Sequence, residues 1–550
     1  MTDAVVTPPS GDALSATEAR ALLERVTSDP DGDVFALTDL PEVVKGALFA
    51  RYSRSAKSLK ELLVTEFAGD LAGGVEPEHA AALYERIFGD YGDDSVAQLG
   101  GAHVALEGIS NLATKRVEWG RLAAYLEQST RYLAYDRRVD GRYRYHRPAA
   151  VMAGPHAEAY ERELDAIFDA YARSLPLVTD WVRARFPRDA ATSEPVWASA
   201  TRAKALDLLR GLLPAATTAN VGVFASGQAY EAMLLRLAAD PLEECRELGM
   251  RLLAELRQVI PSFVARVDRP DRGGAWSAYL AATREDTRAL AERHVVKPEV
   301  LPLLEGAMPE VTLLDRWPHD AIDAEVAVVV AALAPHVRIG ERELEAQVRA
   351  WPDEQRAEVL RAHVGERANR RHKPGRAFER VVYRFEVVGD YGGFRDLQRH
   401  RMCTIEWQDL TTVHGYATPT ELSDAALAEA GVTADWHEAQ ARSDALHRLL
   451  LPDHPAEAAY AVSFAHRLRY TIQINARAAM QLIELRSSPQ GHPQYRAVAQ
   501  AMHRAIAEDA GHRAIADAMV HVDHGAGDLE RLEAERAAER RRAVRMGDAG

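Results

Sequence analysis

The chain has 550 residues, more than a single hydrophobic core normally serves, so roughly two to four domains are expected. Its 47% hydrophobic and 27% charged residues are typical of a globular protein, and its formal net charge of -15 excludes loose, sequence-blind binding to nucleic acid. The two cysteines, Cys245 and Cys403, exclude a disulfide framework and a zinc site built from cysteine alone, and no metal is expected.

Targeting and membrane signals are weak in this sequence. The N-terminus lacks a positive region followed by an apolar one, which a secretory signal would need. The longest apolar run, VAVVVAALA at 326–334, ends at Pro335 and is too short to span a bilayer. We therefore expect a cytoplasmic protein with no membrane partner.

Hydrophobic periodicity predicts many helices and few strands. In chain order, we expect a strand at 46–53 (GALFARYS), helices at 157–175, 243–260 and 353–364, strands at 380–388 and 469–475, and a solvated helix or frayed tail at 529–545. The helical segments place apolar residues on one stripe with charge opposite, whereas the strand segments alternate β-branched and aromatic residues. The expected fold class is α+β.

A coarse internal repeat divides the chain. AYEAMLLRL (229–237) is soon followed by EECREL, and AAMQLIELR (478–486) is soon followed by YRAVAQAM. Both pairs are typical of a helix with an arginine near its end, a turn, and a second helix. Proline and glycine cluster in RPDRGGAW (269–276), a natural seam. We predict two related halves, 1–275 and 276–550, each helix-rich with a small sheet.

The first stretch that indicates chemistry is AAYLEQSTRYLAYDRR, which contains Glu127, Gln128, Ser129, Thr130 and Arg131. Hydroxyl groups, exposed backbone N–H groups and a guanidinium that converge on one point can hold a phosphate. The alternative is a helix N-cap beside a solvated arginine, and the S-T-R run alone favours that simpler reading.

The second stretch is FRDLQRHRMCTIEW, where Arg399, His400 and Arg401 stand in succession after an apolar strand. Two cations beside an imidazole repel one another unless an anion or an electron-rich ring lies among them. A bound nucleotide, a carboxylate pair or plain water would satisfy that requirement.

The third stretch is YTIQINARAAMQLIELRSS. Asn475 can cap the following helix, and Arg477 and Arg486 lie near its two ends. If all three face one ligand, that ligand is long, for example a dinucleotide cofactor together with a substrate. Otherwise the arginines lie on the surface of an amphipathic helix.

Taken together, these stretches resemble the flavin-dependent thymidylate synthases, whose signature has the form R-H-R-x-x-S-x-N-E-x-S-x-R-Y. The second half opens the signature with Arg399, His400, Arg401 and Thr404, and then departs from it at Glu406, Trp407, Asp409 and Thr411. The first half departs at Trp119, Gly120 and Arg121, and keeps Glu127, Ser129, Arg131 and Tyr132. Each half retains what the other has lost.

Three further boxes follow the same pattern. Arg210 stands in the place of the family's downstream A-R-x-V-L-P arginine in the first half, whereas the second half has Ala459 there. The N-A-R box is intact only in the second half, as Asn475, Ala476 and Arg477. HKPGRAFE, from His372 to Glu379, resembles the family's H-x-S-x-F-E box with a short insertion.

The resemblance implies a fused pair of family domains with one working composite site. Family members are tetramers whose sites lie between subunits, so fusion lets one site keep every part while the other erodes. A homodimer of this chain would then act as a pseudo-tetramer.

The resemblance also implies the reaction: transfer of a methylene group from methylenetetrahydrofolate to C5 of dUMP, with FAD as cofactor and NADPH as reductant, without a cysteine nucleophile. Positioning and electrostatics must then carry the catalysis. Arg399 and Arg486 are expected to be catalytic and to bind the pyrimidine nucleotide. The remaining substrate residues are Glu127, Gln128, Ser129, Thr130, Arg131 and Arg210, and the FAD residues are His372, Glu379, His400, Arg401, Asn475, Arg477 and Gln481.

Two departures from the family signature leave the identity of the pyrimidine nucleotide substrate open. The family's nucleotide-reading glutamine, three residues before R-H-R, is replaced by Asp396, and the signature asparagine is absent from both halves. A methylase or hydroxymethylase acting on another pyrimidine nucleotide, such as UMP or dCMP, is therefore an alternative. A non-catalytic scaffold of the same fold is a third.

Overall fold

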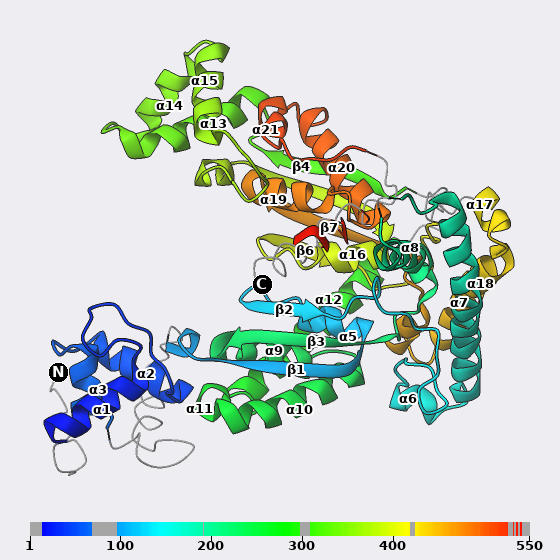
Figure 1. The fold of residues 1–550 in the computed structure, drawn as a ribbon, viewed down its shortest axis with the longest axis horizontal. Helices are drawn as coiled ribbons and strands as arrows, with labels where there is room; N and C mark the ends of the chain where they lie inside the picture. Colours follow the sequence, from blue (N-terminus) through cyan, green and yellow to red (C-terminus); the bar gives the residue numbers. More distant parts are fainter. Residues whose placement is uncertain are drawn as a thin grey trace. The chain divides into compact units, whose positions relative to one another are not determined.

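The computed structural model describes residues 14–68, 96–190, 192–296, 308–418 and 424–525, together with 532, 535, 536 and 539–541. The fold is mixed α and β and mostly helical, with two small antiparallel sheets, which confirms the expected α+β class (Figure 1). Of the predicted tail at 529–545, the structure describes only 532, 535, 536 and 539–541, all of them helical. No helix in the described ranges is both long and apolar enough to cross a bilayer.

Two compact units make up the chain. The first takes its described residues from Met1–Glu107, Arg116–Glu127 and Asn220–Val296, and the second from Gly108–Lys115, Gln128–Ala219 and Lys297–Gly550. The chain thus passes between the units several times. The division at 275/276 stays a prediction, and helix α12 (Gly273–His294) begins within the proline- and glycine-rich segment around it.

The first unit holds most of the sheet with strand order β1-β3-β2, formed by β1 (Gly101–Ser110), β3 (Thr218–Ser226) and β2 (Ala123–Glu127). Helix α9 (Gly227–Ala238) contacts β1, where the Tyr230 hydroxyl donates to the Ala102 carbonyl at 3.1 Å. The helices of this unit are α1 (Ala16–Val26), α2 (Glu42–Tyr52), α3 (Leu59–Thr65), α9 (Gly227–Ala238), α10 (Glu243–Val259), α11 (Pro261–Val264) and α12.

The predicted strand at 46–53 is wrong, because this segment lies in α2. Buried residues fall at Val43, Val44, Ala47 and Leu48, which is helical spacing along one face. The window that suggested a strand was too short to separate a buried strand from a buried helix. The predicted helices at 157–175, 243–260 and 353–364 and the strands at 380–388 and 469–475 are confirmed to within a few residues, except that the first helix continues to Arg185.

The second unit holds the sheet β4-β5-β7-β6, in which every neighbouring pair is antiparallel. Its strands are β4 (Glu310–Trp317), β5 (Val382–Asp390), β6 (Cys403–Trp407) and β7 (Arg467–Asn475). Strand β4 was missed by the sequence analysis. The helices of this unit are α6 (Ala149–Met152), α7 (Ala157–Arg185), α8 (Glu194–Leu209), α13 (Ala321–Leu333), α14 (Glu341–Arg349), α15 (Asp353–Val364), α16 (Tyr391–Leu397), α17 (Asp424–Glu429), α18 (Thr433–Leu450), α19 (Ala476–Arg486), α20 (Pro493–Ala507) and α21 (Arg513–Asp517), while α5 (Asn111–Val117) runs across the division.

The order of elements repeats along the chain. A central strand of each sheet, β3 or β7, leads directly into a helix, α9 or α19, and a second helix follows. The interval along the chain from the start of β3 to the start of β7 equals the interval from Pro214 to Ser463. Pro214 and Ser463 pair in an antiparallel bridge within the second unit. Backbone bonds flank the bridge, from Ala215 N to Val462 O at 2.8 Å and from Phe464 N to Leu213 O at 2.9 Å. Equivalent segments of the two halves therefore pair with each other, as in a two-fold interface.

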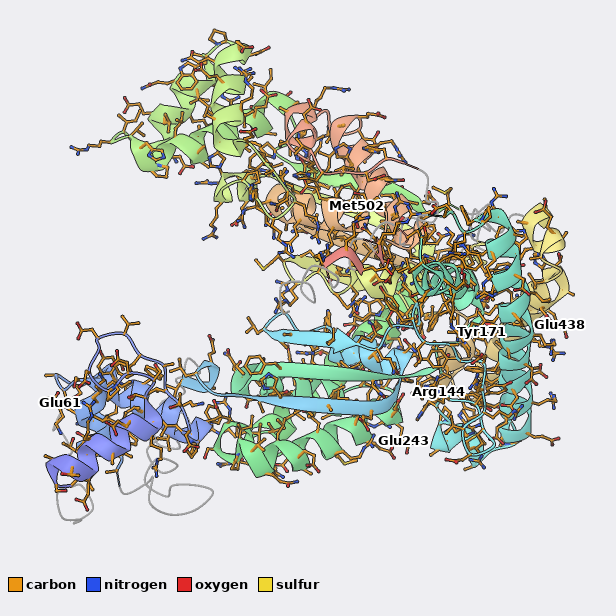
Figure 2. All side chains as sticks on the ribbon, in the orientation of Figure 1. Glu61, Arg144, Tyr171, Glu243, Glu438 and Met502 are labelled. Carbon is orange, nitrogen blue, oxygen red and sulfur yellow. The ribbon has the colours of Figure 1, made fainter. Side chains whose placement is uncertain are left out.

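Helices α7 and α18 also come from opposite halves and lie side by side in the second unit (Figure 1). Arg442 on α18 bonds Glu163 on α7 at 2.6 Å, and Arg173 on α7 bonds Asp435 on α18 at 2.7 Å. Figure 2 labels Tyr171, a fully buried residue of α7, and Glu438 of α18 on this helix pair. Through such packing the first-half segment 128–219 joins the sheet of the second half in one unit.

Candidate functional site

The centre of the candidate site is a buried carboxylate, Asp396, surrounded by arginine side chains. Arg399 forms a short ion pair with it, Arg486 Nη1 lies 3.5 Å from Oδ1, and Arg210 Nη1 lies 3.4 Å from Oδ2. Arg486 also donates from Nη2 to the backbone carbonyl of Asp396 at 2.6 Å. Three arginines predicted as site residues, one from the first half and two from the second, thus meet in one unit.

Local sequence explains how this cluster is assembled. Asp390 ends β5 and caps α16, because its side chain accepts from Gly393 N at 2.9 Å. A Cβ atom at Gly392 would lie 3.2 Å from Arg210 Nε, and one at Gly393 would lie 2.5 Å from Asp390 Oδ1. The G-D-Y-G-G run therefore lets the first turn of α16 approach an arginine that follows α8.

Two neighbouring buried carboxyl groups, Asp390 and Asp396, have pKa values shifted in opposite directions. Burial raises the pKa of Asp396, but four guanidinium groups outweigh that effect and lower the pKa far below its usual range. These groups are Arg399, Arg486, Arg210 and Arg131. Burial instead raises the pKa of Asp390 to about 6, in spite of the attraction of Arg210. Asp396 is therefore an anion throughout the physiological pH range.

Arg131 comes from the S-T-R stretch and contacts the turn before α20. It forms a bidentate pair with Asp207, at 2.7 and 2.8 Å, and donates at 2.8 Å both to the Tyr495 hydroxyl and to the Gln490 carbonyl. The Arg486 guanidinium lies 5.3 Å from the centre of the Tyr495 ring. Tyr495 thus connects Arg131 with the cluster around Asp396.

Arg210 is the member of the cluster that most lacks acceptors. It is 2% exposed, and its Nε and Nη2 atoms are buried without a hydrogen-bond partner. Buried donors left unsatisfied normally cost about 1–3 kcal/mol each. An anionic ligand would supply the missing acceptors, and Arg399, which is 30% exposed at its side chain, offers a second guanidinium near the surface.

His400 is held as a neutral acceptor. Its Nε2 atom accepts from Arg486 Nε at 2.9 Å, and arginine can only donate. Burial, reinforced by Arg486 and Arg399, lowers the pKa of His400 to about 3. The imidazole therefore adds no positive charge among the arginines, which resolves the repulsion expected of three adjacent basic residues.

Most of the residues predicted for FAD gather around the first turns of α19, whereas His400 bonds Arg486 at the end of this helix. Asn475 caps this helix by accepting from Ala478 N at 2.9 Å, which is the capping role that the sequence analysis gave as its simpler explanation. Arg477 donates to the Pro374 carbonyl at 2.9 Å and lies 3.6 Å from Glu379, while Gln481 accepts from Lys373 at 2.5 Å. His372 lies in the same exposed loop.

This group is short of negative charge. Burial and the nearby Arg477 and Arg370 lower the pKa of Lys373, whose attraction to Glu484 does not compensate. Glu484 is already held by Arg367 in a bidentate pair at 2.6 Å, with both side chains 1% exposed. The other carboxylate of this group, Glu379, is shared by Arg376 and Arg477. Positive charge therefore remains in excess around Lys373, which suits a pyrophosphate group, so the residues present fit the FAD that the sequence analysis expected.

Other predicted residues lie elsewhere. Glu127 is the last residue of β2 in the first unit, whereas Gln128 begins the 128–219 segment of the second. Ser129 Oγ accepts from Arg131 N at 3.2 Å, and Thr130 is buried. Arg401 is exposed just before β6.

Sequence reasoning missed several participants: Asp207, Tyr495, Gln490, Lys373 and Arg367. One signal was available, because Asp207 precedes Arg210 by three residues on a helix and so faces the same side. The contacts of Tyr495 and Gln490 with Arg131 join residues far apart in the sequence, and no local pattern indicates them.

Comparison with known proteins gives a consistent result. Residues 41–262 and 313–510 match the family described as "Thymidylate synthase complementing protein". The chain is 37% identical to a UPF0159 protein of Chlamydia pneumoniae, covering 88% of this chain and 91% of that one. It is 36% identical to a UPF0159 protein of Chlamydia muridarum, covering 94% of this chain and 97% of that one. A Thermoplasma acidophilum UPF0159 protein is 29% identical, covering 89% of this chain and 97% of that one.

A solved structure described as a UMP/dUMP methylase PolB from Streptomyces cacaoi bound with 5-Br dUMP is also similar. Sequence identity is 19% and the TM-score is 0.31, with 38% of this chain and 96% of that chain covered.

Proposed function

The chain belongs to the thymidylate synthase complementing protein family, the flavin-dependent thymidylate synthases, and on this premise we propose that it methylates dUMP at C5. The proposed co-substrates are methylenetetrahydrofolate and NADPH, and the proposed cofactor is FAD. One composite site, built from both halves of the chain, would carry the reaction.

The observation that carries this proposal is the convergence of Arg131 and Arg210, from the first half, with Arg399 and Arg486, from the second. Asp207 neutralises Arg131, but Arg210, Arg399 and Arg486 together carry more positive charge than Asp396 can neutralise. A nucleotide phosphate and the carbonyl oxygens of a pyrimidine ring would supply the remaining acceptors.

The proposed roles follow from these positions. Arg131 and Arg210, with Gln128, Ser129 and Thr130 beside them and Glu127 preceding them, would hold the phosphate and sugar. Arg399 and Arg486 would orient the uracil ring and stabilise the negative charge that develops on its carbonyl oxygens. The neutral His400 accepts from Arg486 and so helps hold its guanidinium in place.

FAD, when bound, supplies the hydride that completes the methyl group. Around the first turns of α19 it would be held by Arg477, Gln481, His372, Glu379 and Asn475, together with Lys373. His400 and Arg401, from the segment before β6, would complete the set. Along an α-helix, Arg477 and Arg486 lie about 14 Å apart, so the two ends of α19 could hold two parts of an extended flavin–nucleotide pair.

We further propose that the chain is a fused pair of family domains and that two chains form a homodimer with the pseudo-symmetry of a tetramer. The match of two separate regions to one family and the bridge between Pro214 and Ser463 support the fusion. A cytoplasmic location fits a nucleotide-modifying enzyme of this kind.

A second candidate is methylation or hydroxymethylation of another pyrimidine nucleotide, such as UMP or dCMP. Asp396 stands where the family has a glutamine, and a carboxylate can accept hydrogen bonds but cannot donate one to the O4 atom of uracil. The exocyclic amino group of cytosine would suit it better. A non-catalytic scaffold is the third candidate.

Tritium release tests the three candidates. The full chain, purified with FAD, is supplied with methylenetetrahydrofolate, NADPH and C5-tritiated dUMP, UMP or dCMP. Release from dUMP alone supports the first candidate, release from UMP or dCMP favours the second, and no release with no bound flavin favours the third. Arg399→Ala and Ser129→Ala should both abolish release, and loss in only one of them contradicts a shared site.

A further inference from the structure

The first unit contains a separate cavity of about 270 Å³ that no proposed role uses. It lies among the segment leading into β2, helix α9 and the start of α12. Its lining residues are Gly120, Arg121, Leu122, Ala123, Tyr125, Gln228, Ala229, Glu231, Ala232, Leu235, Arg236 and Trp276. All of them belong to the first unit.

Arg236 is the distinctive group of this cavity. None of the described residues accepts a hydrogen bond from its guanidinium or forms an ion pair with it, and its Nε atom is buried without a partner. Burial lowers the pKa of Arg236, and within the described ranges only the phenol of Tyr125 opposes this effect. A desolvated cation without an acceptor is costly unless a ligand completes the site.

The other charged groups do not neutralise Arg236. Glu231 lines the same cavity, but both of its oxygens are taken by Arg266, at 2.5 and 2.7 Å. This pair is electrically balanced, so the charge of Arg236 remains available to an anion in the cavity.

Aromatic and apolar side chains surround this cation. The Trp119 ring lies 5.4 Å from the Arg236 guanidinium and is 51% exposed. Trp276 and Leu122, both in the lining, are 54% and 63% exposed. Exposed indoles beside a guanidinium without acceptors suit a planar aromatic ligand that carries a negative group.

The repeat gives this cavity a counterpart. Gln228 is the second residue of α9 after its cap, Ser226, as Arg477 is the second residue of α19 after Asn475. The cavity therefore occupies, in the first half, the helix start that carries the residues proposed for FAD in the second. Its volume lies just below the usual range of ligand sites, about 300–1,000 Å³, so a mononucleotide fits better than a dinucleotide.

We propose that this cavity binds a nucleoside monophosphate, with the phosphate on Arg236 and the base against Trp276. The ligand would be held at a site of its own, within the first unit. The proposal does not require the methylation reaction, because none of its residues belongs to the site around Asp396.

The test is the stoichiometry of binding to the full chain, measured by isothermal titration calorimetry with AMP, CMP, GMP, UMP and dUMP in turn. Arg399→Ala serves as the background that weakens the other site, and Arg236→Leu is added to it. Loss of one bound equivalent on adding Arg236→Leu supports the proposal. Equal stoichiometry and affinity in the two chains for every nucleotide overturns it, whether or not the chain methylates dUMP.

Thermal unfolding without ligand gives a second, independent readout. Arg236→Leu should raise the Tm, because it removes a half-buried charge that no carboxylate among the described residues balances. A lowered Tm would mean that Arg236 stabilises the fold instead of waiting for a ligand, and would also overturn the proposal. Arg251→Leu, on the exposed face of α10 in the same unit, is the matched control and should leave nucleotide binding unchanged.

Discussion

The carboxylate of Asp396 offers the sharpest test of the arginine cluster. Asp396→Asn keeps the shape of the side chain and removes its charge, which leaves the surrounding arginines without their anion. With an effective dielectric constant of about 20, each contact at 3.4–3.5 Å is worth about 5 kcal/mol before the cost of burial. Deleting one partner of a buried ion pair typically costs about 3–5 kcal/mol, so we expect a destabilisation of this size at pH 7.

The pH dependence has a defined sign. Because the arginines lower the pKa of Asp396 below the unfolded value of about 3.9, its contribution to stability is complete above that pH. The contribution is lost as the pH falls further toward the folded-state pKa. The difference in stability between wild type and Asp396→Asn should therefore be constant from pH 6 to 8 and narrow below about pH 4.

The assay is thermal and urea unfolding with and without phosphate or dUMP. Added anion should restore more of the lost stability in Asp396→Asn than it adds to the wild type, since it replaces the missing charge. Stability at pH 7 equal to wild type, or a loss that neither anion repairs, would refute the idea that these arginines form an anion site.

Asp390→Asn is the matched control, because Asp390 is a buried carboxyl at the other end of the same short helix, α16. Its folded-state pKa is raised to about 6, so its favourable contribution is present below about pH 4 and is lost as the pH rises through 6. Asparagine preserves the cap on Gly393. At pH 8 this variant should be at least as stable as wild type, the opposite of Asp396→Asn.

Three further outcomes are expected. The His400 imidazole should show no titration between pH 5 and 8 by NMR, since its pKa is lowered to about 3, and a midpoint near 6.5 would contradict the bond it accepts. Glu484→Gln should cost about 3–5 kcal/mol of unfolding free energy by leaving Arg367 buried and unpaired, and the double variant Arg367→Met/Glu484→Leu should recover much of that loss in denaturant titrations. Asp207→Asn should raise KM for the nucleotide about tenfold or more by releasing Arg131 from its bidentate pair, and an unchanged KM would show that Asp207 does not position it.

Much of this protein could be read from local patterns. Helical periodicity located α7, α10 and α15, and alternation located β5 and β7, because these elements are long enough for one period to dominate. The boxes containing Arg131, Arg210, Arg399 and Arg486 were found because short runs of the sequence resemble motifs of the family. The strand predicted at 46–53 was wrong because so short an apolar segment fits both the helical period and the strand period.

What the tertiary structure decided is which groups meet. Arg131 contacts Tyr495 and Arg210 contacts Asp396 only because segment 128–219 joins the second-half sheet in one compact unit, through the α7–α18 packing and the bridge at Pro214. The state of each charged group followed from that meeting: the low pKa of Asp396, the neutral His400 and the acceptor-poor Arg210 depend on burial and on distant neighbours. Sequence periodicity reports what a residue does within its own helix or strand, whereas charge, desolvation and long-range pairing act across the folded chain, and they decide where a ligand can bind.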